Sequence, residues 1–122
     1  MPAVGTPTVL VVDDDADARE ATLELLEAAG FRVMTARNGF DALQILWAGL
    51  IPSAILVDLN MPTMDGEALC RELDAQPAYA AIPRIVISGS DGAARAANCN
   101  ALGFVPKPLN ERDLIGLLKS AG

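Results

Sequence analysis

Aspartates follow two apolar segments of this 122-residue chain, at the points where each apolar run stops. Asp13, Asp14 and Asp15 come directly after residues 9–12, and Asp58 comes directly after residues 54–57. Apolar runs of this length are typical of strands covered on both faces of a parallel sheet, so both acidic groups are expected at one sheet edge. Converging carboxylates repel one another, and a divalent cation relieves that repulsion. Because the chain has no histidine, we predict oxygen ligands and a hard ion, Mg²⁺ or Mn²⁺.

Two further polar residues follow later apolar runs, and both suit the transfer of a phosphoryl group to an aspartate. An aspartate beside a bound Mg²⁺ is a competent covalent nucleophile. Ser88 ends the run 84–87 and offers a hydroxyl to a phosphoryl oxygen. Lys107 follows a short apolar stretch and offers the positive charge that such a transfer requires. We therefore predict that these groups meet at the same edge of the sheet.

The elements that must position these residues alternate between strand and helix five times. Short apolar runs predict the strands, and apolar residues three or four positions apart predict the helices. This alternation, with short connections, predicts one α/β domain: a (βα)5 doubly wound parallel sheet with helices on both faces. Its flavodoxin-like strand order, 2-1-3-4-5, is taken from known folds of this type, in which the ends of the first and third strands flank a crevice. The predicted strands are 8–13, 31–36, 54–58, 84–88 and 104–105; the predicted helices are 16–29, 38–48, 66–75, 93–102 and the segment after Asn110.

Several residues have ordinary structural interpretations. Asp15 is expected to cap the first helix rather than to bind metal, and Asp65 is expected to start the third helix. Gly30 is placed to stop the first helix, and Trp47 is expected to pack in the interior. The apolar stripe of the first helix is predicted to be Ala18, Ala21, Leu25 and Ala29.

The chain resembles the receiver domains of response regulators in two-component signalling, over essentially all of its length. The resemblance rests on residues 10–15, 56–62, 64–66, 88–89 and 107–108, including the sequences Val-Asp-Asp-Asp and Asp-Leu-Asn-Met-Pro. It implies that a partner histidine kinase or histidine phosphotransfer protein donates a phosphoryl group to Asp58 with Mg²⁺, which switches a surface for an unknown output partner or domain. The implied metal ligands are Asp14, Asp58, the backbone carbonyl of Asn60 and, through water, Asp13; the implied phosphoryl contacts are Ser88 and Lys107.

The resemblance also implies a switch aromatic, for which Phe104 is the candidate. Phe104 has no hydroxyl, so its inward position would depend on packing alone. The bond from Lys107 to Pro108 is implied to be cis. Lys107 follows Ser88 by 19 positions, a few fewer than is usual in the family, so the fourth helix is expected to be short. Pro106 suits an edge strand, and dimer geometry inherited from the family is not expected.

The composition of the chain argues against several other classes of protein. The net charge of −7, from 9 basic and 16 acidic residues, argues against direct binding to nucleic acid. The apolar runs are too short to span a membrane, and residues 1–8 lack signal-peptide features, so we expect a cytoplasmic protein, monomeric or weakly dimeric. Cys70 and Cys99 have no zinc-site spacing and are expected to be ordinary thiols in a reducing compartment. Residues 1–122 are expected to be one receiver domain, possibly excised from a longer protein.

Two alternative functions remain open from the sequence. One is an interaction module with a vestigial pocket, which the short fourth helix would suit. The other is a phosphohydrolase similar to haloacid dehalogenases, which also use a strand-end aspartate and Mg²⁺. That family expects a second acid two positions after the nucleophile, where this chain has Asn60. The main hypothesis is a signalling protein, not an enzyme beyond phosphorylation and dephosphorylation of its own Asp58.

Overall fold

A computed structural model describes residues 7–59, 61, 64–88, 95–107 and 109–121. Its centre is a parallel five-stranded sheet of order β2-β1-β3-β4-β5, so the predicted fold and strand order are confirmed. Each crossover returns the chain in the same direction, which brings the carboxyl ends of all five strands to one edge. The strands are β1 (Thr8–Val12), β2 (Arg32–Ala36), β3 (Ala54–Asp58), β4 (Arg84–Ser88) and β5 (Gly103–Pro106).

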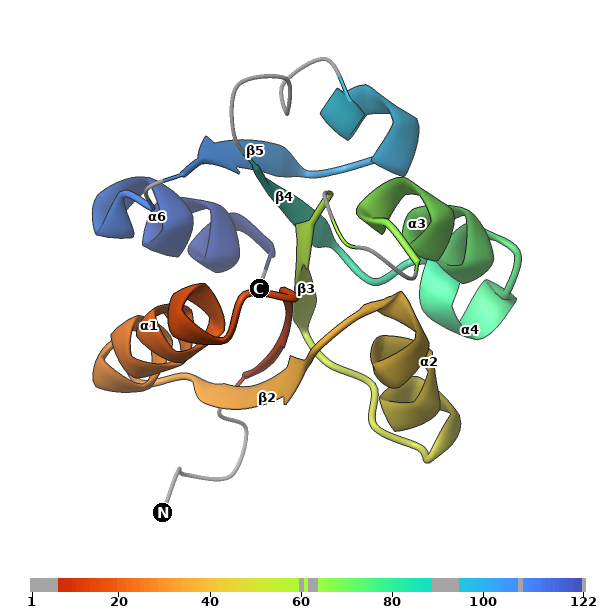
Figure 1. The fold of residues 1–122 in the computed structure, drawn as a ribbon, viewed down its shortest axis with the longest axis horizontal. Helices are drawn as coiled ribbons and strands as arrows, with labels where there is room; N and C mark the ends of the chain where they lie inside the picture. The colour runs from red at the N-terminus through yellow and green to blue at the C-terminus, as the bar shows by residue number, and fades with distance from the viewer. Residues whose placement is uncertain (1–6, 60, 62–63, 89–94, 108, 122) are drawn as a thin grey trace.

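Helices cover both faces of this sheet (Figure 1). Figure 1 shows α1 and α6 on one side and α2, α3 and α4 on the other. The helices are α1 (Ala16–Ala28), α2 (Gly39–Trp47), α3 (Gly66–Asp74), the one-turn α4 (Pro77–Ala80) and α6 (Glu111–Ala121), with a 3₁₀ turn, η1, at Ala97–Cys99. Among the described residues, no helix has the length and apolarity that a membrane span needs.

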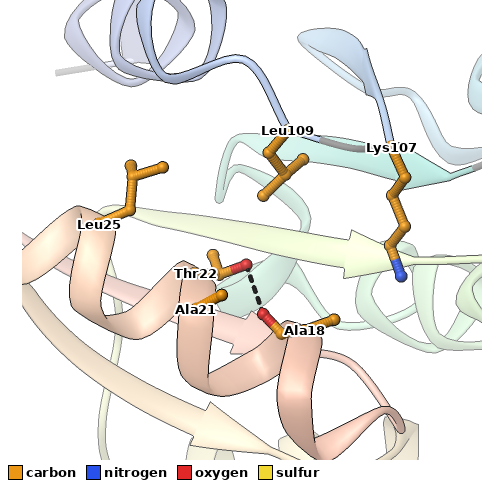
Figure 2. A pocket seen from close by; sticks show the side chains of 6 residues that line it. All are labelled: Ala18, Ala21, Thr22, Leu25, Lys107 and Leu109. Carbon is orange, nitrogen blue, oxygen red and sulfur yellow. Dashed lines mark hydrogen bonds between the residues drawn. The ribbon is translucent and has the colours of Figure 1, made fainter.

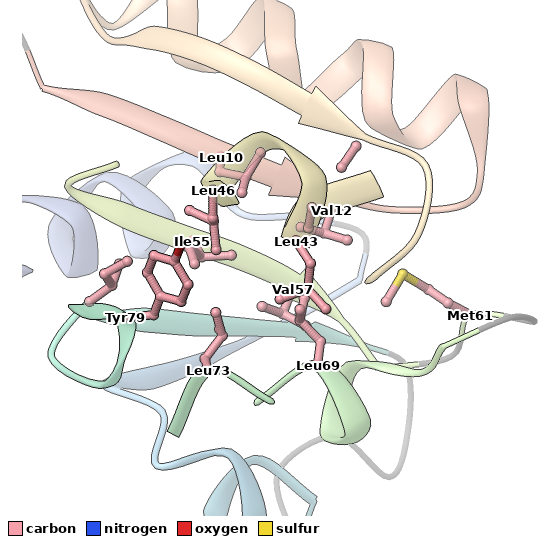
Figure 3. Close-up of a cluster of buried hydrophobic side chains, with 13 residues drawn as sticks. Leu10, Val12, Leu43, Leu46, Ile55, Val57, Met61, Leu69, Leu73 and Tyr79 are labelled. Atoms are coloured by element: carbon pink, nitrogen blue, oxygen red, sulfur yellow. The ribbon is translucent and has the colours of Figure 1, made fainter. Parts of the chain in front are cut away.

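Alternate side chains of each central strand enter different hydrophobic cores. Leu10, Val12, Ile55 and Val57 pack against α2 and α3, in the cluster shown in Figure 3. The intervening strand residues pack against α1 and α6. This two-sided burial explains why β1, β3 and β4 are continuous apolar runs without polar alternation.

Helix caps agree with the sequence. The side chains of Asp15, Asn38 and Asp65 each accept a backbone N–H from the first turn of α1, α2 and α3. Asn110 does the same for α6, at 3.2 Å from the Asp113 nitrogen. Gly30 follows α1 with a φ of 96°, a conformation that glycine adopts without strain.

The buried face of α1 differs from the predicted stripe. Thr22 and Leu26 are buried, whereas Ala21 and Ala29 are exposed. The Thr22 hydroxyl donates to the Ala18 carbonyl at 2.9 Å, so this polar side chain enters the core with its hydrogen bond satisfied. The prediction for Trp47 is also wrong, because its side chain lies on the outside of α2 and is 56% exposed.

The connections around β4 also differ from expectation. Between α3 and β4 the chain forms the short helix α4, which begins at Pro77 and was not among the predicted helices. Residues 93–94 of the predicted fourth helix lie outside the described residues; the described part is helical only through Cys99 and ends at Asn100, whose φ is +51°. Leu102, the predicted last residue of that helix, lies in the extended approach to β5, where its N–H donates to the Arg84 carbonyl at 2.7 Å.

Candidate functional site

The strand ends place the predicted site residues at one edge of the sheet. Val12 pairs with Val57 between β1 and β3, so Asp13 comes next to Asp58, the last residue of β3. Asp58 in turn pairs with Ile87 on β4, one residue before Ser88.

Lys107 reaches the same edge from β5. Ser88 pairs with Pro106, and the Lys107 N–H donates to the Ser88 carbonyl at 2.8 Å. The parallel register therefore brings residues from four different strands together.

Three carboxylates converge at the ends of β1 and β3. One carboxylate oxygen from each of Asp13, Asp14 and Asp58 lies within 4.8 Å of the other two. Asp13 and Asp58 are buried, and Asp14 is exposed at the rim. Because charges at this spacing repel strongly away from bulk water, the group requires positive charge to remain fully ionised.

Lys107 supplies part of that charge. Its Nζ lies 3.1 Å from Asp13 Oδ2 and 3.2 Å from Asp58 Oδ2. Burial of the ammonium lowers the pKa of Lys107, but hydrogen bonds and charge attraction from Asp13 and Asp58 outweigh burial, so its pKa is raised. Lys107 is therefore a cation held between two carboxylates, and at neutral pH the three acids and one base leave a net negative site.

Backbone groups fix the position of Asp13. Its N–H donates to the Ala36 carbonyl at 3.1 Å, and its Oδ1 accepts the Asp15 N–H at 3.0 Å. The Arg19 guanidinium donates to the Asp13 carbonyl at 2.9 Å. Sequence reasoning missed Arg19; its position in the first turn of α1, four residues after Asp15, was the available signal. The second carboxylate oxygen of Asp13 is thereby oriented toward Lys107 and Asp58.

Ser88 contributes a buried hydroxyl at the same edge. The residue is 1% exposed, and its Oγ has no hydrogen-bond partner among the described residues. A buried polar atom without a partner is costly unless something else satisfies it. An oxygen-rich group bound beside Asp58 would provide that partner.

The donor set fits a hard divalent cation. All three side chains are carboxylates, the ligand type that Mg²⁺ prefers, and the sequence contains no histidine. The exposed Asp14 leaves one side of the group open to solvent, which suits an ion that keeps several waters. Asp13, Asp14 and Asp58 could therefore hold Mg²⁺, as their spacing predicts.

Of three other sequence predictions, the structure places only one. Asn60 and Pro108 lie outside the described residues, so the predicted carbonyl ligand and the predicted cis bond are not addressed. Phe104 is half-buried and packs against a small cluster that includes Leu59, the residue after Asp58. The candidate switch aromatic thus lies one packing layer away from the acidic group.

An apolar hollow of about 320 Å³ adjoins the site (Figure 2). Ala18, Ala21 and Leu25 of α1 line one side, and Leu109 lies opposite. Lys107 lines the same hollow, and its side chain extends along the rim in Figure 2. The α1 stripe predicted to be a core face is therefore the wall of a surface hollow that shares a residue with the acidic site.

Comparison with known proteins identifies the family. The family model described as response regulator receiver domain matches residues 9–119. Protein PilG of Pseudomonas aeruginosa is 34% identical over 115 residues, which cover 92% of this chain and 84% of PilG. The chain belongs to the response regulator receiver domain family, whose members are signalling modules rather than classical enzymes.

Other relatives show how the domain is used in different contexts. The DNA-binding transcriptional regulator NtrC of Escherichia coli is 33% identical over 93% of this chain, but the match spans only 24% of NtrC. Among solved structures, chemotaxis protein CheY4 of Vibrio cholerae has a TM-score of 0.87 at 27% identity, covering 96% of this chain and 99% of that one. The receiver domain of a Syntrophus aciditrophicus histidine kinase has a TM-score of 0.85 at 31% identity, covering 95% and 89%.

Proposed function

We propose that Asp58 accepts a phosphoryl group from a histidine kinase or a histidine phosphotransfer protein, and that this modification switches a partner-binding surface. The observation that carries the proposal is the meeting of Asp58, Lys107 and the Ser88 hydroxyl at one sheet edge beside two further carboxylates. Receiver domains of response regulators act in this way as a class. The assignment of Asp58 as the acceptor is our proposal for this chain.

In the proposed reaction, an Asp58 carboxylate oxygen attacks the phosphorus of a phosphohistidine. A new P–O bond forms while the P–N bond breaks, and the leaving imidazole nitrogen takes up a proton. Lys107 Nζ, now 3.2 Å from Asp58 Oδ2, is placed to turn to a phosphoryl oxygen. Ser88 Oγ, which has no hydrogen-bond partner among the described residues, donates to a second phosphoryl oxygen. Both contacts stabilise charge that grows on the transferred group.

We place Mg²⁺ at Asp14 and Asp58, with Asp13 acting through water and the backbone carbonyl of Asn60 as a further ligand. When bound, the ion supplies positive charge that offsets the acidic group and the incoming phosphoryl oxygens. The role of this chain's residues is to hold the carboxylates close together despite their repulsion. Burial and the backbone contacts of Asp13 hold its carboxylate beside the others before any ion binds.

The hollow beside Lys107 is the proposed docking position of the phosphodonor domain. It is apolar, adjoins the acceptor and is walled by one face of α1. A donor that carries phosphohistidine on an apolar helical surface could rest on Ala21 and Leu25 while the imidazole reaches Asp58. Residues 1–122 contain no histidine, so the phosphoryl group would come from a histidine outside this sequence or from a small phosphodonor such as acetyl phosphate.

The proposed readout begins at Ser88 and Phe104. Movement of Ser88 toward a phosphoryl group would open space on the β4 side, and Phe104 would fill it by packing. The output partner would bind the surface that Phe104 and its neighbours form.

We further propose that residues 1–122 act as one receiver domain in the cytoplasm, as a monomer or weak dimer. Dephosphorylation at Asp58 would be its only further reaction.

Titration with beryllofluoride, a phosphoryl analogue, tests this function in the intact chain. We expect saturable binding only when Mg²⁺ is present, with chemical-shift changes at Ser88, Phe104 and Lys107. Asp58→Asn should abolish binding, while the exposed Asp17→Asn on α1 should leave it unchanged. No binding at millimolar concentrations would refute the proposal in favour of a vestigial pocket, and sustained turnover of a phosphate ester would favour a phosphohydrolase.

A further inference from the structure

Two buried thiols meet between α3 and η1, away from the acidic site. Cys70 lies on α3 and Cys99 ends η1, and both are free and 0% exposed. They belong to one packed cluster with Leu59 and Val86. Neither thiol has a role in the proposed phosphoryl chemistry.

A backbone carbonyl of α3 places the Cys99 sulfur close to the backbone of Cys70. Cys99 Sγ lies 4.0 Å from the carbonyl oxygen of Gly66. In an α-helix this carbonyl also accepts the N–H four residues later, which in α3 belongs to Cys70. The Cys99 sulfur therefore lies against the helical turn that ends at Cys70.

Polar contacts on both sides of the thiols hold η1 along α3. Arg95 Nη2 lies 2.6 Å from Glu67 Oε1, near the start of α3. Asn100 Nδ2 lies 3.0 Å from Asp74 Oδ2, at the end of α3. The two contacts bracket the thiol pair, so its position is fixed from both directions and does not depend on the thiol contact alone.

The two thiols are chemically unequal. The hydrogen bond with Cys99, together with burial, raises the pKa of Cys70. The hydrogen bond from Cys70 lowers the pKa of Cys99, and this effect exceeds the opposing effect of burial. Because the thiolate is the attacking species in disulfide exchange, and Cys99 lies on the short η1 turn rather than within α3, we assign the first attack to Cys99.

We propose that Cys70 and Cys99 are a disulfide-forming pair that reacts with low-molecular-weight disulfides such as oxidised glutathione. The Cys99 thiolate attacks one glutathione sulfur and releases one glutathione thiolate. The Cys70 thiolate then attacks Cys99 in this mixed disulfide and releases the second. The two protein thiols lose two electrons, oxidised glutathione gains them, and the released thiolates take up the two protons.

Burial controls the rate of this reaction. Because both residues are 0% exposed, the segment from Arg95 to Leu102 must move away from α3 before oxidant can enter. Its packing in the cluster depends on small side chains such as Ala96 and Ala101, and the two bracketing contacts lie at the surface or are only partly buried. Local opening of this kind requires less than global unfolding. The disulfide would then fasten the segment to α3 beneath Phe104, which contacts the same cluster.

Equilibration of the wild-type chain in glutathione buffers of graded redox poise tests the proposal. After denaturation and alkylation, mass spectrometry should show both thiols blocked, and the intact mass should be lower by two hydrogen atoms. The same equilibrium is measured in urea, where the thiols meet only by chain diffusion. We expect the equilibrium constant for disulfide formation to be at least about tenfold larger in the folded chain, because folding already brings the sulfurs together.

Three controls make the result decisive. Cys70→Ala should give only a glutathione adduct at Cys99. Asn100→Ala, which removes one bracketing contact, should speed oxidation by easing local opening. Asp58→Asn should oxidise like wild type, so failure of the phosphoryl proposal leaves this one intact. An equilibrium constant equal to or below the urea value, or products limited to mixed disulfides and intermolecular dimers, would overturn the proposal.

Discussion

Replacement of Lys107 by methionine should destabilise the protein by removing the only described cation within the acidic group. Methionine keeps the apolar stem that lines the hollow but removes the ammonium that lies within 3.2 Å of both Asp13 and Asp58. The mutual repulsion of these carboxylates and of Asp14 then increases, and a bound cation would relieve it. The effect is therefore electrostatic, and added positive charge should reverse it.

The size of the effect follows from the two contacts of 3.1 and 3.2 Å. With an effective dielectric constant of about 20, each contact has a gross attraction of about 5 kcal/mol, most of which the desolvation of the charges offsets. Loss of one partner from a fully buried pair costs about 3–5 kcal/mol. Because the Lys107 side chain is 31% exposed, solvent screening reduces this cost to about 2–3 kcal/mol. For a chain of this size that corresponds to a Tm lower by roughly 6–15 °C.

Urea denaturation at neutral pH, with and without Mg²⁺, measures this effect. Lys119→Met is the matched control, because Lys119 is the only other lysine and is exposed at the end of α6. Lys119→Met should lower the free energy of unfolding by less than about 1 kcal/mol, because it removes only the favourable interaction of Lys119 with the helix dipole of α6. Mg²⁺ should stabilise the Lys107 variant more than wild type. Equal stability of the two lysine variants, or an equal Mg²⁺ effect on wild type and Lys107→Met, would refute the reasoning.

The pH dependence of folding stability separately tests whether Lys107 stabilises the folded chain as a cation. The pKa of Lys107 is higher in the folded chain than in the unfolded chain. Its contribution is therefore fully present below the unfolded pKa of about 10.4, and is lost as pH rises through the folded value. The stability difference between wild type and Lys107→Met should be constant up to about pH 10 and should narrow above it. A difference that widened above pH 10 would contradict this assignment.

Four further substitutions test packing and polar contacts, each by urea denaturation. Gly66→Ala should lower the free energy of unfolding by about 1–3 kcal/mol, because a Cβ at this position would lie 2.6 Å from the Asp58 carbonyl oxygen. Gly116→Ala, by contrast, has open space around its Cβ and should stabilise α6 by about 0.5–1 kcal/mol. Ser88→Ala should be neutral or slightly stabilising, by up to about 1 kcal/mol, since it removes a buried hydroxyl that has no hydrogen-bond partner in the described part of the chain. The same variant should weaken beryllofluoride binding at least about tenfold. Arg84→Met should cost about 3 kcal/mol, because the buried guanidinium contacts Asp74 at 2.6 Å and several backbone carbonyls that would lose their donor.

The sheet and the acidic group were predictable because each depends on a local pattern. Continuous apolar runs occur where a strand is covered on both faces, and they located β3 and β4 to the residue. Carboxyl ends of parallel strands share one edge, so the residue after each run had to lie near the others. Asp13, Asp58 and Ser88 were found by this reasoning before any distance was known.

Features that depend on distant partners could not be predicted in the same way. Thr22 is buried because a carbonyl on its own helix satisfies its hydroxyl, which hydrophobic periodicity does not register. Arg84 is 1% exposed because α3, α4 and η1 all supply acceptors to it. The contact between Cys70 and Cys99 likewise depends on how η1 lies along α3, and their spacing in sequence gives no sign of it.

The most direct test of the account is the site and the metal dependence of phosphorylation. The intact chain is incubated with acetyl phosphate in the presence or absence of Mg²⁺, and the modified residue is mapped by mass spectrometry. We predict one phosphoryl group per chain, on Asp58, that forms only with Mg²⁺ and is lost in Asp58→Asn. Modification that persists in Asp58→Asn, or that proceeds equally well without a divalent cation, would contradict the central claim.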